Sequence, residues 1–171
     1  MDIKSKLRHV MDFPKEGVDF IDITTVLQDA DALKETLEAM QERISRYGSF
    51  DLIVGPESRG FIFGTPLAYM TGKGFIPIRK KGKLPYRTIS VEYQLEYGSD
   101  MLEMHEDAVK PGQKVVIVDD LLATGGTTES NIKLVEKLGG EVAGIVYFVE
   151  LTFLNGREKL KGYNVESIVQ F

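Results

Sequence analysis

The stretch that decides the fold reads Val115-Val116-Ile117-Val118-Asp119-Asp120-Leu121-Leu122-Ala123-Thr124-Gly125-Gly126-Thr127-Thr128. It begins with four consecutive β-branched apolar residues, a pattern typical of a strand that is buried on both faces. Two adjacent carboxylates end this expected strand, a short loop of small residues follows, and a helix is expected over 127–138. Because ligands of open α/β sheets bind at the carboxyl ends of the strands, we expect the functional site here.

Strand and helix patterns alternate on both sides of this segment. Short apolar runs predict strands at 51–55, 75–78, 142–149 and 165–169. Helical spacing of apolar residues predicts helices over 29–47 and 58–71, and a short amphipathic helix within the first ten residues. This alternation indicates an α/β fold with a central parallel sheet flanked by helices.

Length and composition restrict the remaining possibilities. The 171 residues fit one domain, 1–171, and 43% hydrophobic with 27% charged residues is ordinary for a globular protein. The net charge of −5 argues against a general binder of nucleic acid or of anionic membranes. The chain has no cysteine, which excludes disulfides and thiolate metal sites, and no apolar run of the roughly 20 residues that a membrane span needs. We therefore expect a cytoplasmic protein.

The loop after the two carboxylates has the properties of a phosphate site. Residues 123–127 would present free backbone N–H groups at a helix N-terminus, and Gly125 and Gly126 would allow close approach. Asp119 and Asp120 would repel a phosphate lying on them, so a ligand with a phosphate at one end and sugar hydroxyls at the other fits better. The alternative interpretation is a plain strand–helix turn with an N-cap. The chain has neither a P-loop pattern nor G-x-G-x-x-G.

Residues 79–107 differ from the rest of the chain. Five of the nine residues from Arg79 to Arg87 are basic, whereas the stretch 88–107 holds six acidic residues and neither Lys nor Arg. The segment has no long apolar run or helix pattern, so we expect a long excursion that includes a β-hairpin. Excursions of this length are usually functional.

The segment 116–128 resembles the 5-phosphoribosyl-1-pyrophosphate (PRPP) binding motif of the type I phosphoribosyltransferases. Three further stretches, Glu57-Ser58-Arg59-Gly60-Phe61, Gly82-Lys83-Leu84-Pro85 and Tyr93-Gln94-Leu95-Glu96-Tyr97-Gly98, resemble the adenine branch of that family. The similarity extends from about Phe13 to Phe171. It implies the fold of the family: a central parallel sheet, a flexible hairpin lid at 79–107, and a small N-terminal hood at 1–28 that binds the base.

The resemblance also implies which residues form the site. Ala123, Thr124, Gly125, Gly126 and Thr127 would bind the 5-phosphate, and Asp119 and Asp120 would bind the ribose hydroxyls. The pyrophosphate would contact Arg59, Arg79, Lys80, Lys83 and Arg87, in part across a homodimer interface. The base would lie against Asp19, Phe20, Arg59 and Leu121. Glu96, in the lid, would be the catalytic residue that manages a proton of the purine. Mg²⁺ would be held by PRPP oxygens, without direct protein ligands.

The implied reaction is purine salvage: adenine and PRPP give AMP and pyrophosphate. Two alternatives stay open at this point. The same fold acts on xanthine or another oxopurine, or the chain is a PRPP-binding regulator without catalysis. A regulator would be expected to have lost the lid chemistry or gained a DNA-binding element, whereas this chain keeps the basic run and Glu96. We therefore expect an enzyme with PRPP, adenine, AMP and pyrophosphate as its partners.

Overall fold

The computed structural model describes residues 1–94 and 97–171, so that Leu95 and Glu96 lie outside the described residues. The described chain divides into two compact units, Met1–Ala39 and Met40–Phe171. Among the described residues, no helix is both long and apolar enough to cross a membrane.

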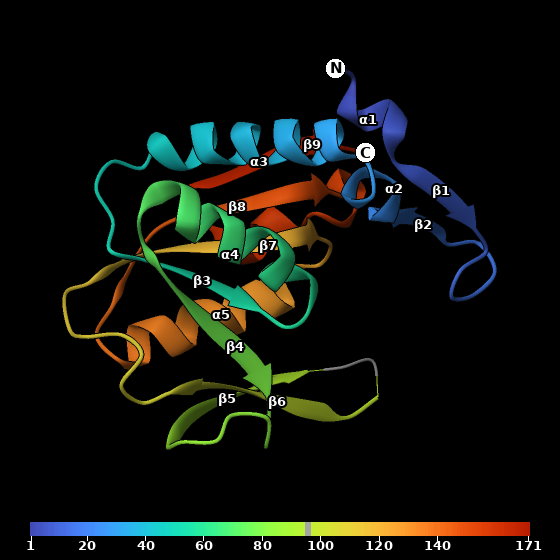
Figure 1. Ribbon diagram of the computed structural model, residues 1–171. Helices are drawn as coiled ribbons and strands as arrows, with labels where there is room; N and C mark the ends of the chain where they lie inside the picture. Colours follow the sequence, from blue (N-terminus) through green and yellow to red (C-terminus); the bar gives the residue numbers. More distant parts are fainter. Residues whose placement is uncertain (95–96) are drawn as a thin grey trace. The chain divides into compact units, whose positions relative to one another are not determined.

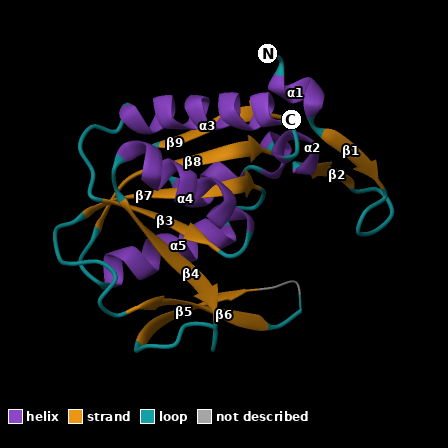
Figure 2. Cartoon of the chain, viewed as in Figure 1, coloured by secondary structure: helices purple, strands orange, loops and turns teal. Residues whose placement is uncertain are grey.

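The first unit is built around an antiparallel pair of strands (Figures 1 and 2). Its elements are α1 (Ile3–Lys6), β1 (Arg8–Met11), β2 (Asp19–Asp22), α2 (Thr24–Leu27) and the first part of α3 (Ala30–Ser45). The expected helix over the first ten residues is wrong beyond Lys6. Leu7 has extended dihedrals (φ −72°, ψ 138°), and the next four residues pair with β2, with His9 opposite Ile21. Ladder hydrogen bonds with a nearby partner strand therefore outweigh a weak helical periodicity.

The second unit contains a seven-stranded sheet with the order β5-β6-β4-β3-β7-β8-β9 (Figures 1 and 2). The strands are β3 (Leu52–Pro56), β4 (Gly74–Lys80), β5 (Thr88–Gln94), β6 (Ser99–His105), β7 (Lys114–Leu122), β8 (Glu141–Glu150) and β9 (Val165–Gln170). The five strands from β4 to β9 along this order are parallel to one another, whereas β6 is antiparallel to both of its neighbours, β4 and β5. The predicted α/β fold with a central parallel sheet is confirmed.

Two helices cover opposite faces of this sheet, α4 (Arg59–Thr71) and α5 (Gly126–Lys137). Two neighbouring residues of β8 contact one of these helices each, because successive side chains of a strand point to opposite faces of the sheet. Phe148 packs against Phe63 of α4 at 5.4 Å between ring centroids, while the Tyr147 hydroxyl hydrogen-bonds to Thr128 of α5. Both aromatic side chains of β8 are fully buried. The long apolar runs of β7 and β8 are therefore the centre of the core.

Strand β7 is longer than its sequence pattern suggests. The apolar run predicts a strand that ends before Asp119, but pairing with β8 continues to Leu122, which lies opposite Glu150. Backbone pairing does not depend on side-chain polarity, so the ladder passes through both carboxylates. Asp119 and Asp120 thus lie within a central strand, which continues for two residues beyond the carboxylates expected at its end.

The segment from Arg79 to Asp107 contains the end of β4 and the hairpin of β5 and β6, which pair from Thr88–His105 to Gln94–Ser99. Three basic residues of this segment (Lys81, Lys83 and Arg87) lie in the connection between β4 and β5. The predicted hairpin is present, and its role as a lid remains a prediction.

Candidate functional site

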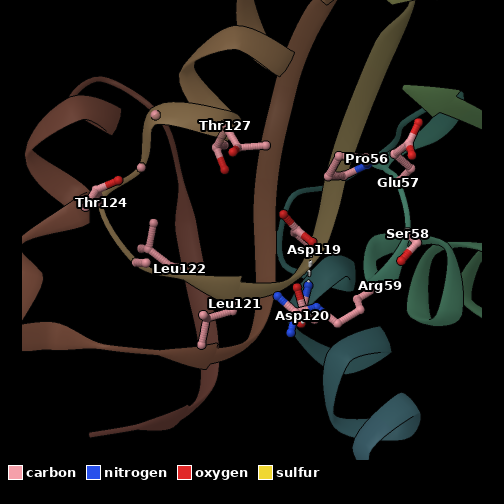
Figure 3. A pocket seen from close by; sticks show the side chains of 14 residues that line it. Pro56, Glu57, Ser58, Arg59, Asp119, Asp120, Leu121, Leu122, Thr124 and Thr127 are labelled. Atoms are coloured by element: carbon pink, nitrogen blue, oxygen red, sulfur yellow. Dashed lines mark hydrogen bonds and ion pairs between the residues drawn. The ribbon is translucent and has the colours of Figure 1, made fainter. Parts of the chain in front are cut away.

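A pocket of about 250 Å³ lies at the carboxyl ends of two adjacent parallel strands, β3 and β7 (Figure 3). Two chain segments line it: Pro56–Arg59, which follows β3 into α4, and Asp119–Thr128, which forms the end of β7 and the start of α5. The second segment is the one on which the sequence analysis placed the site. All seven residues predicted to contact the 5-phosphate and the ribose line this pocket.

The loop from Ala123 to Gly125 brings the N-terminus of α5 to the pocket. Gly125 is the N-cap and has φ 86°, a left-handed conformation that glycine adopts without steric cost. A Cβ atom on Gly125 would also lie 2.6 Å from the carbonyl oxygen of Gly156, so the packing excludes any side chain here. The first N–H groups of α5 have no intrahelical partner. The loop therefore offers backbone donors and a favourable helix dipole to an anion.

The first turn of α5 is attached to the sheet by a buried pair of hydroxyl groups. The Thr128 hydroxyl hydrogen-bonds to the Tyr147 hydroxyl of β8, and both residues are buried. Burial raises the pKa of Tyr147 far above its ordinary value, so the phenol stays protonated. This contact could not be predicted from the sequence, because a tyrosine inside an apolar strand gives no signal of its hydroxyl partner.

Asp119 and Asp120 differ in their surroundings although they are adjacent. In Figure 3 the two side chains leave β7 in different directions. Asp119 accepts a hydrogen bond from the backbone N–H of Asp120 at 2.8 Å, and it is buried. Burial raises its pKa well above the ordinary value, and the neighbouring charge of Asp120 adds to this effect. Asp120 instead forms an ion pair with Arg59, 2.9 Å from guanidinium Nε to Oδ2.

Glu57 connects the pocket to the basic segment at the end of β4. Its Oε1 accepts a hydrogen bond from the backbone N–H of Lys80 at 2.8 Å and lies 3.3 Å from Nε of Arg79. Its own N–H donates to the carbonyl of Ile78 at 2.8 Å. The Glu57–Ser58 peptide bond is cis. This carboxylate therefore anchors the start of the basic run beside the pocket, a contact that the sequence analysis missed because it joins residues 23 apart in the chain.

The basic residues predicted to bind pyrophosphate differ in whether they line the pocket. Arg59 lines the pocket, whereas Arg79, Lys80, Lys83 and Arg87 lie outside its lining. Arg87 is exposed and lies 3.7 Å from Glu106 across the base of the hairpin. The contacts expected of these four residues with pyrophosphate remain predictions.

The residues predicted for the base come from both compact units. In the first unit, Oδ2 of Asp19 lies 2.7 Å from Nδ1 of His9, and the ring of Phe20 meets that of Phe13 edge-on at 5.2 Å. In the second unit, Leu121 and Arg59 line the pocket. Glu96, predicted as the catalytic residue, lies outside the described residues.

Comparison with known proteins points in the same direction as the pocket. The family model of the phosphoribosyl transferase domain matches residues 24–168. The adenine phosphoribosyltransferase of Acetivibrio thermocellus is 77% identical over 171 residues, covering 100% of each chain.

Solved structures agree with this family. The crystal structure of adenine phosphoribosyltransferase from Thermoanaerobacter pseudethanolicus has a TM-score of 0.95 at 56% identity, over 99% of this chain and 98% of that one. The Saccharomyces cerevisiae enzyme, in complex with D-2,5-dideoxy-2,5-imino-altritol 1,6-bisphosphate and adenine, has a TM-score of 0.89 at 38% identity, covering 97% and 96%. The fold, the pocket and these relatives lead to one conclusion: the chain belongs to the phosphoribosyltransferase family.

Proposed function

We propose that this enzyme transfers the 5-phosphoribosyl group of PRPP to adenine, giving AMP and pyrophosphate in purine salvage. The observation that carries the proposal is the pocket at the ends of β3 and β7, where a helix N-terminus and two carboxylates lie side by side. Relatives at 77% and 72% identity over the full chain are adenine phosphoribosyltransferases. The S. cerevisiae relative was crystallised with adenine and a bisphosphate, ligands that correspond to a base and a sugar with two phosphate ends.

The phosphate loop supplies binding for the 5-phosphate. Backbone N–H groups of residues 123–127, at the N-terminus of α5, would donate to the phosphate oxygens. The carboxylates of Asp119 and Asp120 would accept hydrogen bonds from the ribose hydroxyls, and charge-assisted bonds of this kind are among the stronger ones in proteins. The phosphate and the ribose together fix the anomeric carbon relative to the protein.

Pyrophosphate departure and adenine attack occur at that carbon. The bond from the carbon to the pyrophosphate oxygen breaks, the bond to the adenine nitrogen forms, and positive charge develops on the ribose in between. The protein needs no nucleophile of its own, so alignment, charge stabilisation and exclusion of water supply the rate enhancement. Arg59, Arg79, Lys80, Lys83 and Arg87 would stabilise the leaving pyrophosphate. Glu96 would accept the proton that adenine loses from its imidazole ring.

Adenine would be recognised mainly through backbone groups. It presents an amino donor at C6 and an acceptor at N1, a pair that one C=O and one N–H can read. Phe20 and Leu121 would pack on the ring, with Asp19 and Arg59 beside it. A 6-oxo purine reverses the C6 donor and would leave buried groups mismatched, each costing about 1–3 kcal/mol.

Mg²⁺ fits the donor set of this pocket. Asp119 and Asp120 are hard oxygen donors next to the place proposed for the ribose, and Mg²⁺ typically binds through few carboxylates together with substrate phosphates. When bound, the ion neutralises charge on pyrophosphate. We propose that it is held by PRPP oxygens, with the two carboxylates orienting the hydroxyls that share it.

We also propose that the enzyme is a cytoplasmic homodimer. The chain has no cysteine, so its fold does not depend on disulfides and is compatible with a reducing compartment. The outer face of α4 exposes two large apolar side chains, Ile62 and Tyr69, and Tyr69 is 88% exposed. Burial of these side chains between two copies would remove apolar surface from water.

A panel of bases tests the function. The purified enzyme is given PRPP and Mg²⁺ with adenine, hypoxanthine, guanine or xanthine, and nucleotide formation is followed by chromatography. We expect adenine to exceed every 6-oxo purine by at least about a hundredfold in kcat/KM. Comparable turnover of xanthine would overturn the adenine assignment in favour of an oxopurine enzyme. Binding of PRPP without turnover of any base would indicate a regulator.

A further inference from the structure

The short helix η2 (Gly156–Leu160) and the residue after it carry three basic side chains, and their partners differ. Arg157 donates from Nε and Nη2 to the two carboxylate oxygens of buried Glu150, at 2.7 and 2.8 Å. Lys161 pairs with Glu158 at 2.7 Å. Lys159 lies between them, and within residues 1–94 and 97–171 the structure gives its ammonium group neither an ion pair nor a hydrogen bond. Its positive charge is therefore available to a ligand.

Lys159 runs along the phosphate loop. A Cβ atom placed on Gly125 would lie 3.5 Å from Cβ of Lys159, and one placed on Gly126 would lie 3.8 Å from its Nζ. The side chain thus starts beside Gly125 and brings its ammonium group to Gly126, the first residue of α5. This neighbour could not be predicted from the sequence, because Lys159 and Gly126 are far apart in the chain.

The backbone that carries Lys159 is fixed on both sides. Gly156 packs directly behind the loop, where a Cβ atom on it would lie 2.5 Å from the carbonyl oxygen of Ala123. Arg157 is held by Glu150, and Leu160 is buried in a core cluster with Leu122 and residues of the sheet. A lysine whose neighbours are this firmly packed is presented at a defined position, which reduces the entropy lost when its ammonium meets an anion.

The lining of the pocket has more negative than positive side chains, and the charge of Lys159 would reduce this imbalance. Its lining holds three carboxylates, on Glu57, Asp119 and Asp120, and one cation, Arg59, which is already paired with Asp120. The part formed by the phosphate loop, residues 123–127, contains no charged side chain. A phosphate dianion bound there would be held by neutral donors alone, the backbone N–H groups and the hydroxyls of Thr124 and Thr127, close to carboxylates that repel it. An ammonium group beside Gly126 lowers this repulsion.

We propose that Lys159, a residue of η2, is the cation of the 5-phosphate subsite and attracts the phosphate of PRPP and AMP. This inference rests on the phosphate site proposed for residues 123–127. Because the 5-phosphate is unchanged during the reaction, Lys159 contributes equally to the ground state and the transition state. Its loss should therefore raise the KM for PRPP and leave kcat unchanged.

Lys159→Met tests the proposal, since methionine keeps an unbranched stem and removes the charge. Calorimetric titration with AMP should show a Kd about three- to tenfold higher than in the wild type, the size expected for one exposed charge acting on a dianion. The salt dependence of AMP affinity should decrease at the same time. In steady-state assays the KM for PRPP should rise similarly, while kcat and the KM for adenine stay within about twofold of the wild-type values.

Two variants serve as controls. Lys159→Arg keeps the charge and should restore AMP affinity to within about twofold of the wild type. Lys161→Met removes a charge two residues away that is paired with Glu158, and it should bind AMP like the wild type. Equal AMP affinity of Lys159→Met and the wild type, or equal losses in Lys159→Met and Lys161→Met, would overturn the proposal. Gly126→Val distinguishes a failure of the Lys159 proposal from a failure of the phosphate site. Normal AMP binding by that variant would refute the phosphate site itself.

Discussion

The guanidinium Nε of Arg59, the first residue of α4, lies 2.9 Å from Oδ2 of Asp120 on β7. The Asp120 side chain is 7% exposed and that of Arg59 47%, so the arginine covers the carboxylate from the solvent side. The pair joins the two segments that line the pocket. It also leaves Asp119 as the carboxylate of the two without an ion pair among the described residues, and burial raises the pKa of this carboxyl.

Replacement of Asp119 by asparagine should make the stability of the protein less dependent on pH. Burial raises the pKa of Asp119 well above its ordinary value of 3.8, so the folded protein binds this proton more tightly than the unfolded chain does. The contribution to stability is complete below pH 3.8 and is lost as pH rises through the raised pKa. An asparagine side chain cannot ionise, and it keeps an oxygen for the Asp120 N–H.

Thermal melts from about pH 4 to about pH 8 measure this effect, and they should show a growing advantage of Asp119→Asn over the wild type as pH rises. Exposed Asp107→Asn is the matched control and should show no such trend. An Asp119→Asn variant that is less stable than the wild type at the alkaline end would contradict the argument.

Removal of both carboxylates should impair the handling of PRPP. Each charge-assisted hydrogen bond to a ribose hydroxyl is worth about 1.5–3 kcal/mol. We expect Asp119→Asn/Asp120→Asn to bind PRPP at least about tenfold more weakly in calorimetric titrations, with an unchanged circular dichroism spectrum. Wild-type PRPP affinity in the double variant would remove both residues from the site.

The two glycines of the phosphate loop should respond oppositely to alanine. Gly125 has φ 86° and no room for a Cβ atom, whereas the nearest atom to a Cβ on Gly126 is Nζ of Lys159, 3.8 Å away. Gly125→Ala should lose about 2–4 kcal/mol of unfolding free energy through strain and the collision with Gly156. Gly126→Ala should be neutral or up to about 1 kcal/mol more stable, because alanine favours a helix. Urea unfolding measures both, and equal stabilities would show that the loop backbone adjusts.

Glu96→Gln should slow the chemical step more than it weakens binding. Glutamine keeps the size and hydrogen bonding of the side chain but cannot accept the proton, and general acid–base assistance is typically worth about 10²–10⁴-fold. Since product release or lid opening often limits kcat in enzymes that close, single-turnover kinetics are the appropriate measurement. We expect the rate to fall at least about tenfold, with little change in the KM for adenine and PRPP. A single-turnover rate equal to that of the wild type would make Glu96 an ordinary solvated carboxylate.

The sequence predicted most of what depends on local pattern. The strand–loop–helix from Val115 to Thr128 and the alternation of apolar runs led to the α/β class, to the phosphate loop and to the two carboxylates. The sequence did not reveal contacts that depend on the order of the strands in the sheet or on where distant segments of the chain fold back against each other. Glu57 meets Lys80 because β3 and β4 are neighbours, and Lys159 meets Gly126 because η2 folds back behind the loop. The end of β7 was also misplaced, because the ladder with β8 continues through both carboxylates although these residues are charged.

The loop at the start of α5 is proposed to bind the 5-phosphate, and Gly126→Val is the variant that examines this binding. The backbone at Gly126 is helical and a Cβ atom there has space, so valine should fold normally while its branches crowd the donors of the loop. Calorimetric titration with AMP is the measurement, with circular dichroism to verify the fold. We expect the Kd for AMP to rise at least about tenfold. A folded Gly126→Val protein that binds AMP with wild-type affinity would contradict it and place the phosphate elsewhere.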